Sequence, residues 1–99
     1  MNYVYISILK EIIEIAQIEV NEINDGKCSK WDVNHLVKVI IPEMKELLSY
    51  ALNGEVFFKY GPNQRLLESS YIIVDSLERL NDTKLGKKIE ELQALYNSL

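Results

Sequence analysis

The chain has only one cysteine, Cys28, and only one histidine, His35. A single cysteine cannot form a disulfide within the chain, and this fits a reducing cytosol better than secretion. One cysteine and one histidine are also too few for a structural zinc site. Asp32 and His35 have metal-ligand spacing on a helix, but a di-metal carboxylate bundle needs two such pairs and further glutamates. We therefore expect no metal and no other cofactor.

Glycine-rich loops and long apolar runs are absent as well. The four glycines stand singly, so the sequence has no glycine-rich loop of the kind that cradles a phosphate. No apolar run approaches the roughly 18 residues that a membrane helix needs. The first residues lack the basic region and the long apolar stretch of a signal peptide. These absences predict a cytoplasmic protein that does not enter a membrane.

No set of side chains forms a catalytic pattern. Cys28 and His35 lie on either side of an expected helix start, with no motif for an orienting group or an oxyanion hole. The carboxylates of Glu11 and Glu14 fall on a solvent face, where neither burial nor a cleft would prepare them for acid–base catalysis. We expect no catalytic residue, and we predict that the protein is not an enzyme.

Basic residues are scarce in the first quarter of the chain. The net charge is −4, and residues 1–25 account for all of it, because Lys10 stands there against five acidic side chains. Nucleic-acid binding depends on lysine and arginine facing phosphates, so this balance argues against a nucleic-acid partner. An acidic segment leaves open a basic protein partner. It also promotes solubility without any partner.

What the sequence does contain is a regular succession of amphipathic segments. Ninety-nine residues, 47% of them apolar, are enough for one domain with its own core over residues 1–99. Segments with helical spacing that are joined by short loops predict an all-α fold. We expect a single antiparallel bundle of about four helices, the second of them kinked at Pro42.

The first segment spans about residues 3–24. Its apolar residues recur at three-and-four spacing, which predicts one amphipathic helix, and Gly26 suits the left-handed position that ends it. Ile18 instead falls on the polar face, where it is ringed by three acidic residues, Glu11, Glu14 and Glu22. This isoleucine is either an ordinary exposed side chain or a contact point for a basic partner.

The second segment begins at Ser29 and includes Pro42. The sequence Ser29-Lys30-Trp31-Asp32 matches a capping box, with aspartate in place of the usual glutamate. Pro42 removes a backbone donor and clashes with the preceding turn, so a straight helix is excluded. The apolar stripe keeps its phase across Pro42, which predicts one helix kinked near Ile41 or two nearly collinear helices. The stripe consists of Val33, Val37, Ile40, Met44, Leu47 and Ala51.

Residues 55–60 join the second and third segments. Their conformation stays open, with a packed loop or one short helical turn preferred, because a lone strand would have no pairing partner. Their aromatic side chains form either a plug over the end of the bundle or part of a binding surface, and we prefer the plug. These side chains are Phe57, Phe58 and Tyr60.

The third segment is expected to run from Gly61-Pro62 to Leu80, with Pro62 at the first helical position. Its buried stripe would be Leu66, Ser70, Ile73, Leu77 and Leu80. Its outer row would be Arg65, Glu68, Ile72, Asp75 and Arg79, with Asp75 and Arg79 at the spacing of a helical ion pair. This row is either a solvated face or a contact site around Ile72.

The fourth segment begins near Asp82-Thr83, either of which could cap it, and its stripe continues to Leu99. Gly86 lies in its first turn, where glycine weakens a helix by up to about 1 kcal/mol relative to alanine.

An acidic, all-helical chain of this size, with tight loops and no active site, resembles the small immunity proteins that protect bacteria against their own secreted or contact-delivered toxins. The resemblance covers the whole chain in size and character rather than a motif. It implies a non-catalytic inhibitor that occludes a cognate toxin, often a nuclease with a basic substrate cleft. Charge complementarity would speed the association and select the partner.

The residues that we predict to bind such a partner come from two segments. They are Glu11, Glu14, Ile18, Glu22, Arg65, Ile72 and Asp75. The alternative is a self-associating structural or adaptor bundle, in which the wide apolar face of the first segment, with Tyr3, Tyr5 and Ile6 at its start, is buried in a homodimer. The oligomeric state in solution discriminates between the two hypotheses.

Overall fold

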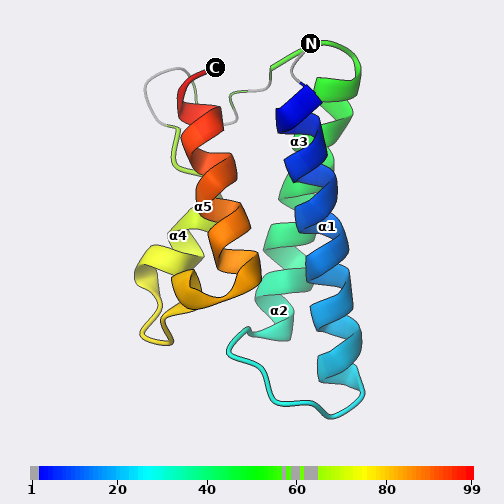
Figure 1. Ribbon diagram of the computed structural model, residues 1–99, viewed down its shortest axis with the longest axis vertical. Coiled ribbons are helices and arrows are strands. Elements are labelled where there is room, and N and C mark those ends of the chain that lie inside the picture. The colour runs from blue at the N-terminus through cyan, green and yellow to red at the C-terminus, as the bar shows by residue number, and fades with distance from the viewer. Residues whose placement is uncertain (1–2, 57, 59–60, 62–64) are drawn as a thin grey trace.

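The computed structural model describes residues 3–56, 58, 61 and 65–99. All regular elements of this described part are helical, so the predicted all-α bundle is confirmed. Successive helical segments run in alternating directions (Figure 1). The elements are α1 (Tyr3–Asn24), α2 (Val33–His35), the π-helical turn η1 (Leu36–Ile40), α3 (Ile41–Leu52), α4 (Glu68–Asp75), the 3-10 turn η2 (Leu80–Asp82) and α5 (Lys84–Asn97).

Helix α1 is the central element, because it packs against both α3 and α5. Its bounds agree with the predicted segment, and its apolar stripe is buried. Gly26 ends it with a φ of +90°, and the N–H of Lys27 donates to the carbonyl of Glu22, as in a Schellman motif. Tyr5 and Ile6 are buried within the chain itself. Most of the apolar face of this segment therefore belongs to the internal core, while Tyr3 and Val4 at its start are exposed.

The start of α2 corrects the predicted capping box. Asp32 is the N-cap, and its carboxylate accepts from the N–H of Asn34 at 2.7 Å. Ser29 lies outside the helix, where its hydroxyl accepts from the N–H of Trp31 and donates to the Glu19 carboxylate. The buried ring of Trp31 thus precedes the helix instead of occupying its first turn.

A π-helical turn joins α2 to α3 immediately before Pro42. The N–H of Ile41 donates to the carbonyl of Leu36, one residue further back than in an α-helix. The wider turn changes which residues face the core: Leu36 is fully buried, whereas Val37, which we predicted in the buried stripe, is exposed. Pro42 lies in the first turn of α3, as one of the two predictions has it. A bend of the axis at Pro42 stays a prediction.

The third segment differs most from its prediction. Helix α4 covers only Glu68–Asp75, and the described residues on either side, 65–67 and 76–79, are not helical. Leu66 and Leu77, which we placed in the buried stripe, are exposed, and Leu77 is 98% exposed. The predicted ion pair of Asp75 with Arg79 is also wrong. Arg79 has a left-handed φ of 55° beyond the helix and pairs with Asp82 at 3.2 Å. The predicted helix start at Pro62 lies outside the described residues.

The remaining predictions for the C-terminal half agree with the structure. Thr83 caps α5 by accepting from the N–H of Gly86 at 3.0 Å. The described residues 55, 56 and 58 are not in a helix or strand, which fits the loop. Phe58 packs against Tyr96 with ring centroids 5.5 Å apart, so it acts as the predicted plug. Phe57 and Tyr60, the other aromatic residues of that prediction, lie outside the described residues.

Burial of Tyr5 predicts a loss of stability at alkaline pH. Its surroundings raise the pKa of this phenol, chiefly through desolvation and further through Tyr96 and the Glu43 carboxylate. Because the fold favours the neutral phenol of Tyr5, its contribution to stability is complete below the unfolded pKa of about 10. This contribution is lost as the pH rises from there toward the higher pKa of the folded state. We expect Tyr5→Phe to flatten the fall in unfolding free energy above about pH 10, measured by urea denaturation. Tyr3→Phe, at a ring that is 78% exposed, is the control, and equal slopes in both variants would contradict the prediction.

Candidate protein-binding surface

The position of α4 is set by a carboxylate from another helix. Leu67 precedes α4 and offers no side-chain cap, so the first N–H groups of the helix need another acceptor. Glu43 of α3 supplies it. Its carboxylate is 97% buried and accepts from the N–H groups of Glu68 and Ser69, both at 2.9 Å, and from the Ser69 hydroxyl at 2.6 Å. A negative charge at a helix N-terminus is also favoured by the helix dipole.

The chain that leads into α4 is tied to α5. The side-chain amide of Gln93 donates to the carbonyl of Arg65 at 2.7 Å and accepts from the N–H of Leu67 at 3.0 Å. The guanidinium of Arg65 donates to the carbonyls of Asn97 and Leu99 and lies 4.4 Å from the centre of the Phe58 ring. Arg65 therefore holds this end of the bundle together, a role that differs from the partner contact that we predicted for it.

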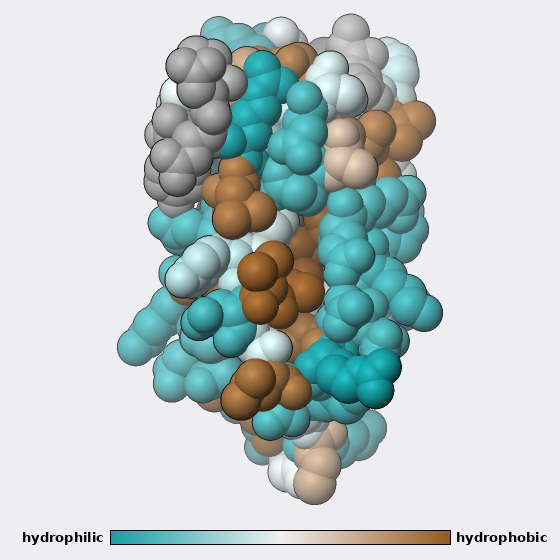
Figure 2. Space-filling model, turned by 90° about the vertical axis from the view of Figure 1, so that its left-hand side faces the viewer, coloured by the Kyte–Doolittle hydropathy of each residue, from teal (hydrophilic) through white to brown (hydrophobic). Residues whose placement is uncertain are grey.

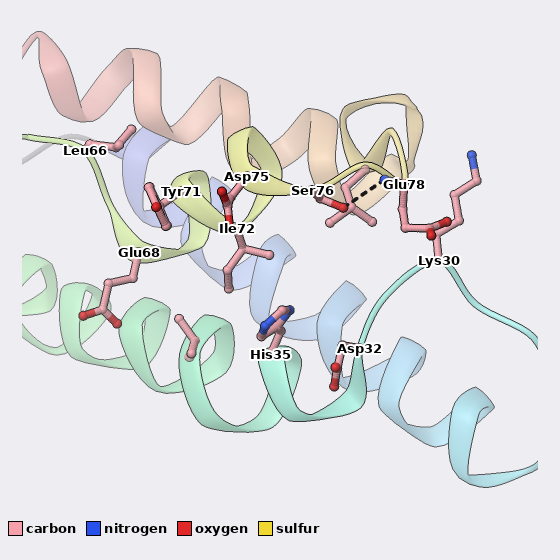
Figure 3. A pocket seen from close by; sticks show the side chains of 12 residues that line it. Lys30, Asp32, His35, Leu66, Glu68, Tyr71, Ile72, Asp75, Ser76 and Glu78 are labelled. Atoms are coloured by element: carbon pink, nitrogen blue, oxygen red, sulfur yellow. Dashed lines mark hydrogen bonds between the residues drawn. The ribbon is translucent and has the colours of Figure 1, made fainter.

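Between α4 and the α2–η1 segment lies an open cleft of about 630 Å³, which we call the α4 cleft (Figure 3). Ile72 points from α4 across this cleft toward the helical segment that carries His35. The predicted site residues Ile72 and Asp75 both line it. The full lining consists of Lys30, Asp32, His35, Val39, Leu66, Glu68, Tyr71, Ile72, Asp75, Ser76, Glu78 and Leu80.

Acidic groups dominate the charge of the α4 cleft. Four of its lining side chains are acidic, against one lysine, Lys30, and one histidine, His35. Among the residues that the structure describes, the carboxylates of Asp32, Asp75 and Glu78 have no cationic partner. The loop after α4 keeps Glu78 at the cleft, because the Glu78 N–H donates to the Ser76 hydroxyl at 3.0 Å. A positively charged group that enters the cleft would therefore meet uncompensated negative charge.

Large apolar side chains are exposed along α4 and its two ends, two of them within the cleft and two outside it. We call this set the α4 strip; it consists of Leu66, Tyr71, Val74 and Leu77. Their exposed fractions are 44, 55, 73 and 98% respectively. Figure 2, which looks onto the side that carries α4, shows brown apolar side chains down the middle of this face between hydrophilic borders. Several exposed large apolar side chains on one face mark a candidate protein-binding site.

The acidic residues that we predicted on α1 are largely compensated. Glu11 forms an ion pair with Lys88 of α5 at 3.0 Å, and this contact is the main cause that raises the pKa of Lys88. Glu22 lies 3.8 Å from Lys27. Ile18 is 50% exposed, as predicted, and lines a second cleft of about 400 Å³ together with Glu22. That cleft contains two acidic and two basic side chains, Glu19, Glu22, Lys30 and Lys84.

The structure therefore separates the seven predicted residues. Ile72 and Asp75 meet in the α4 cleft, Ile18 and Glu22 line the second cleft, Glu14 is exposed on α1, and Glu11 and Arg65 hold the bundle together. The sequence did not reveal the exposed strip, because a helix that continued past Asp75 would have buried Leu77. Ser76, a residue suited to turns, is the one local signal that could have indicated an earlier helix end.

Comparison with family models, with curated proteins and with solved structures found no match to this chain. Within the described part of the chain, no group of three histidine, cysteine or acidic side chains could hold a metal ion. Among the same residues, no helix has both the length and the apolar character needed to cross a membrane. The exposed surface of α4 is consequently the basis for assigning a function.

Proposed function

We propose that this protein is a non-catalytic, protein-binding inhibitor, an immunity protein that neutralises a cognate toxin by covering it. The α4 strip and the adjoining α4 cleft form the binding surface. The toxin is a protein with a basic surface, such as a nuclease with a cationic substrate cleft. Binding buries the strip, and the acidic residues of the cleft select the partner by charge.

The observation that carries this proposal is the exposure of the α4 strip, which includes Leu77, the most exposed large apolar side chain among the described residues. Leu77 is 98% and Val74 is 73% exposed, while Leu9, Ile12 and Leu92 are fully buried. Covering a large apolar side chain is worth about 1.5–3 kcal/mol, so a free strip favours association with another surface. The strip also extends beyond the cleft, since Val74 and Leu77 do not line it.

A homodimer is the alternative. The start of α1 offers it a limited apolar surface, because Tyr5 and Ile6 are buried within the chain, whereas Tyr3 and Val4 are exposed. A symmetric dimer with its twofold axis at the carboxyl end of α4 would bring the carboxylates of Asp75 and Glu78 from both copies together, and like charges repel. We expect a monomer whose mass, measured by light scattering, is independent of concentration.

Co-expression tests the proposed function. The C-terminal domain of the protein encoded immediately beside this one is expressed with and without this chain, and growth and co-purification are measured. We expect the neighbour to inhibit growth, this chain to relieve the inhibition, and the two proteins to co-purify. A harmless neighbour, or toxicity that this chain does not relieve, would refute the immunity function.

Matched substitutions locate the surface in the same experiment. Val74→Ser with Leu77→Ser should weaken binding to the partner at least about tenfold, because two apolar contacts are lost. Leu52→Ser with Val56→Ser changes two other exposed apolar residues, 53 and 45% exposed, at the end of α3 and in the loop after it, and should leave the affinity within about twofold. Equal affinities for both double variants would place the interface elsewhere on the molecule.

A further inference from the structure

We infer that the α4 cleft binds a cationic amphipathic helix, contributed by the partner, that lays its apolar face on the cleft floor and its basic side chains along the acidic rim. This inference rests on the proposed function and specifies the chemistry of the partner. The occupant is a segment of another protein rather than a second copy of this chain.

The apolar part of the site is the floor of the cleft and the edge of α4. Ile72 and Val39 are half-buried on opposite walls, and Ile72 points across the cleft in Figure 3. Tyr71 lines the same cleft with 55% of its surface exposed. A helix laid in an apolar groove presents residues at three-and-four spacing to such walls, which is a common mode of peptide recognition.

The charged part is the rim near the carboxyl end of α4. Asp75 and Glu78 lie within one turn of chain, and Asp32 lines the cleft from the start of α2, where its carboxylate also accepts from the N–H of Asn34. None of these three carboxylates has a cationic partner among the described residues. Lysine or arginine on the helix would pair with Asp75 and Glu78. Lys30 lies at the Glu78 end of the cleft in Figure 3 and would repel basic groups there.

This arrangement selects against other occupants. A second copy would place the like-charged rims face to face. An acidic helix would meet the same repulsion. The second cleft, beside Ile18, has a balanced lining of two acidic and two basic side chains and offers no comparable selection for a cation. A third cleft, beside Val74, has a single acidic lining residue, Glu90, against four in the α4 cleft.

The test uses a synthetic leucine–lysine peptide of about 18 residues, roughly five helical turns, and its leucine–glutamate counterpart. Isothermal titration calorimetry gives the dissociation constant for the full chain. We expect the lysine peptide to bind the wild type and the glutamate peptide not to bind. Asp75→Asn with Glu78→Gln should weaken binding of the lysine peptide about tenfold. Raising the salt from about 50 to about 300 mM should weaken wild-type binding more than binding to this variant.

Two matched controls distinguish binding at the α4 cleft from a general effect of net charge or of exposed apolar side chains. Asp25→Asn with Glu55→Gln removes the same net charge from exposed turns outside the cleft and should change the dissociation constant less than about twofold. Tyr71→Ser should weaken binding about fivefold or more, whereas Tyr3→Ser, at a more exposed ring on α1, should not.

The inference is overturned if the lysine peptide does not bind, if both charge variants weaken it equally, or if the glutamate peptide binds as well. Its failure is distinct from that of the proposed function. If the Asp75→Asn/Glu78→Gln variant no longer binds the lysine peptide but still neutralises the toxin in co-expressing cells, the immunity function stands and only the assignment of the partner's helix to this cleft is wrong. If the lysine peptide binds at the α4 cleft but this chain does not neutralise the neighbouring protein, the immunity function is wrong and the cleft remains a binding site for a cationic helix.

Discussion

Glu43→Ala is expected to lower the free energy of unfolding by about 3 kcal/mol. The substitution removes the acceptor of three hydrogen bonds, from the N–H groups of Glu68 and Ser69 and from the Ser69 hydroxyl. Ser69 is fully buried, so water does not readily replace the lost carboxylate. Urea denaturation of the variant and the wild type measures the difference.

The loss should be concentrated in α4. Because Glu43 holds the N-terminus of α4, hydrogen exchange of the amides of 68–75 should accelerate in Glu43→Ala more than exchange in α1. The α4 cleft would lose a wall at the same time, so binding of the partner should fall as well. Glu46→Ala, an exposed glutamate on the same helix, is the matched control and should change stability by less than about 0.5 kcal/mol.

Glu43→Gln separates the role of charge from that of shape. The amide keeps the length of the side chain, but only its oxygen accepts, and its NH₂ group faces donors. We expect a stability between those of the wild type and Glu43→Ala. If Glu43→Ala were as stable as the Glu46→Ala control, the carboxylate would have no part in holding α4.

Gly86→Ala is the second large effect, and its sign is the opposite of what helix propensity predicts. Alanine is favoured over glycine inside a helix by about 1 kcal/mol. At this position, however, a Cβ atom would lie 1.9 Å from the carbonyl oxygen of Leu80 and 2.7 Å from its carbon. Both atoms belong to the backbone and cannot rotate away. We expect a net destabilisation of about 3 kcal/mol, measured by urea or thermal denaturation.

The close approach at Gly86 has a structural purpose. The η2 turn, Leu80–Asp82, folds back onto the first turn of α5, and Thr83 joins them by donating to Leu80 and accepting from Gly86. Lys87→Ala changes the next residue of the same helix, at an exposed position, and should alter stability by less than about 0.5 kcal/mol. A Gly86→Ala variant that is more stable than the wild type would show that the turn and the helix do not touch as described.

The sequence by itself determined the fold class, the extent of α1, the stripe of α5 and its start near Asp82-Thr83, and the exposure of Ile18. Each of these depends on local information. Amphipathic spacing at three and four residues shows which face of a helix is apolar, and a capping residue or a left-handed glycine marks an end within a few residues.

Only the tertiary structure decided where α4 begins and ends, and therefore where the candidate binding surface lies. The cap of α4 comes from Glu43, 25 residues away from Glu68, and no local pattern connects the two. The position of Glu43 beside Ile40, Met44 and Leu47 of a buried stripe was the one sign in the sequence that its carboxylate has a partner inside the fold. Gly86 is required for the same kind of reason, since the carbonyl that leaves no room for a Cβ atom belongs to Leu80, outside the helix. Periodicity reports the average environment of a helix face, whereas caps and close approaches depend on which distant groups the fold brings together.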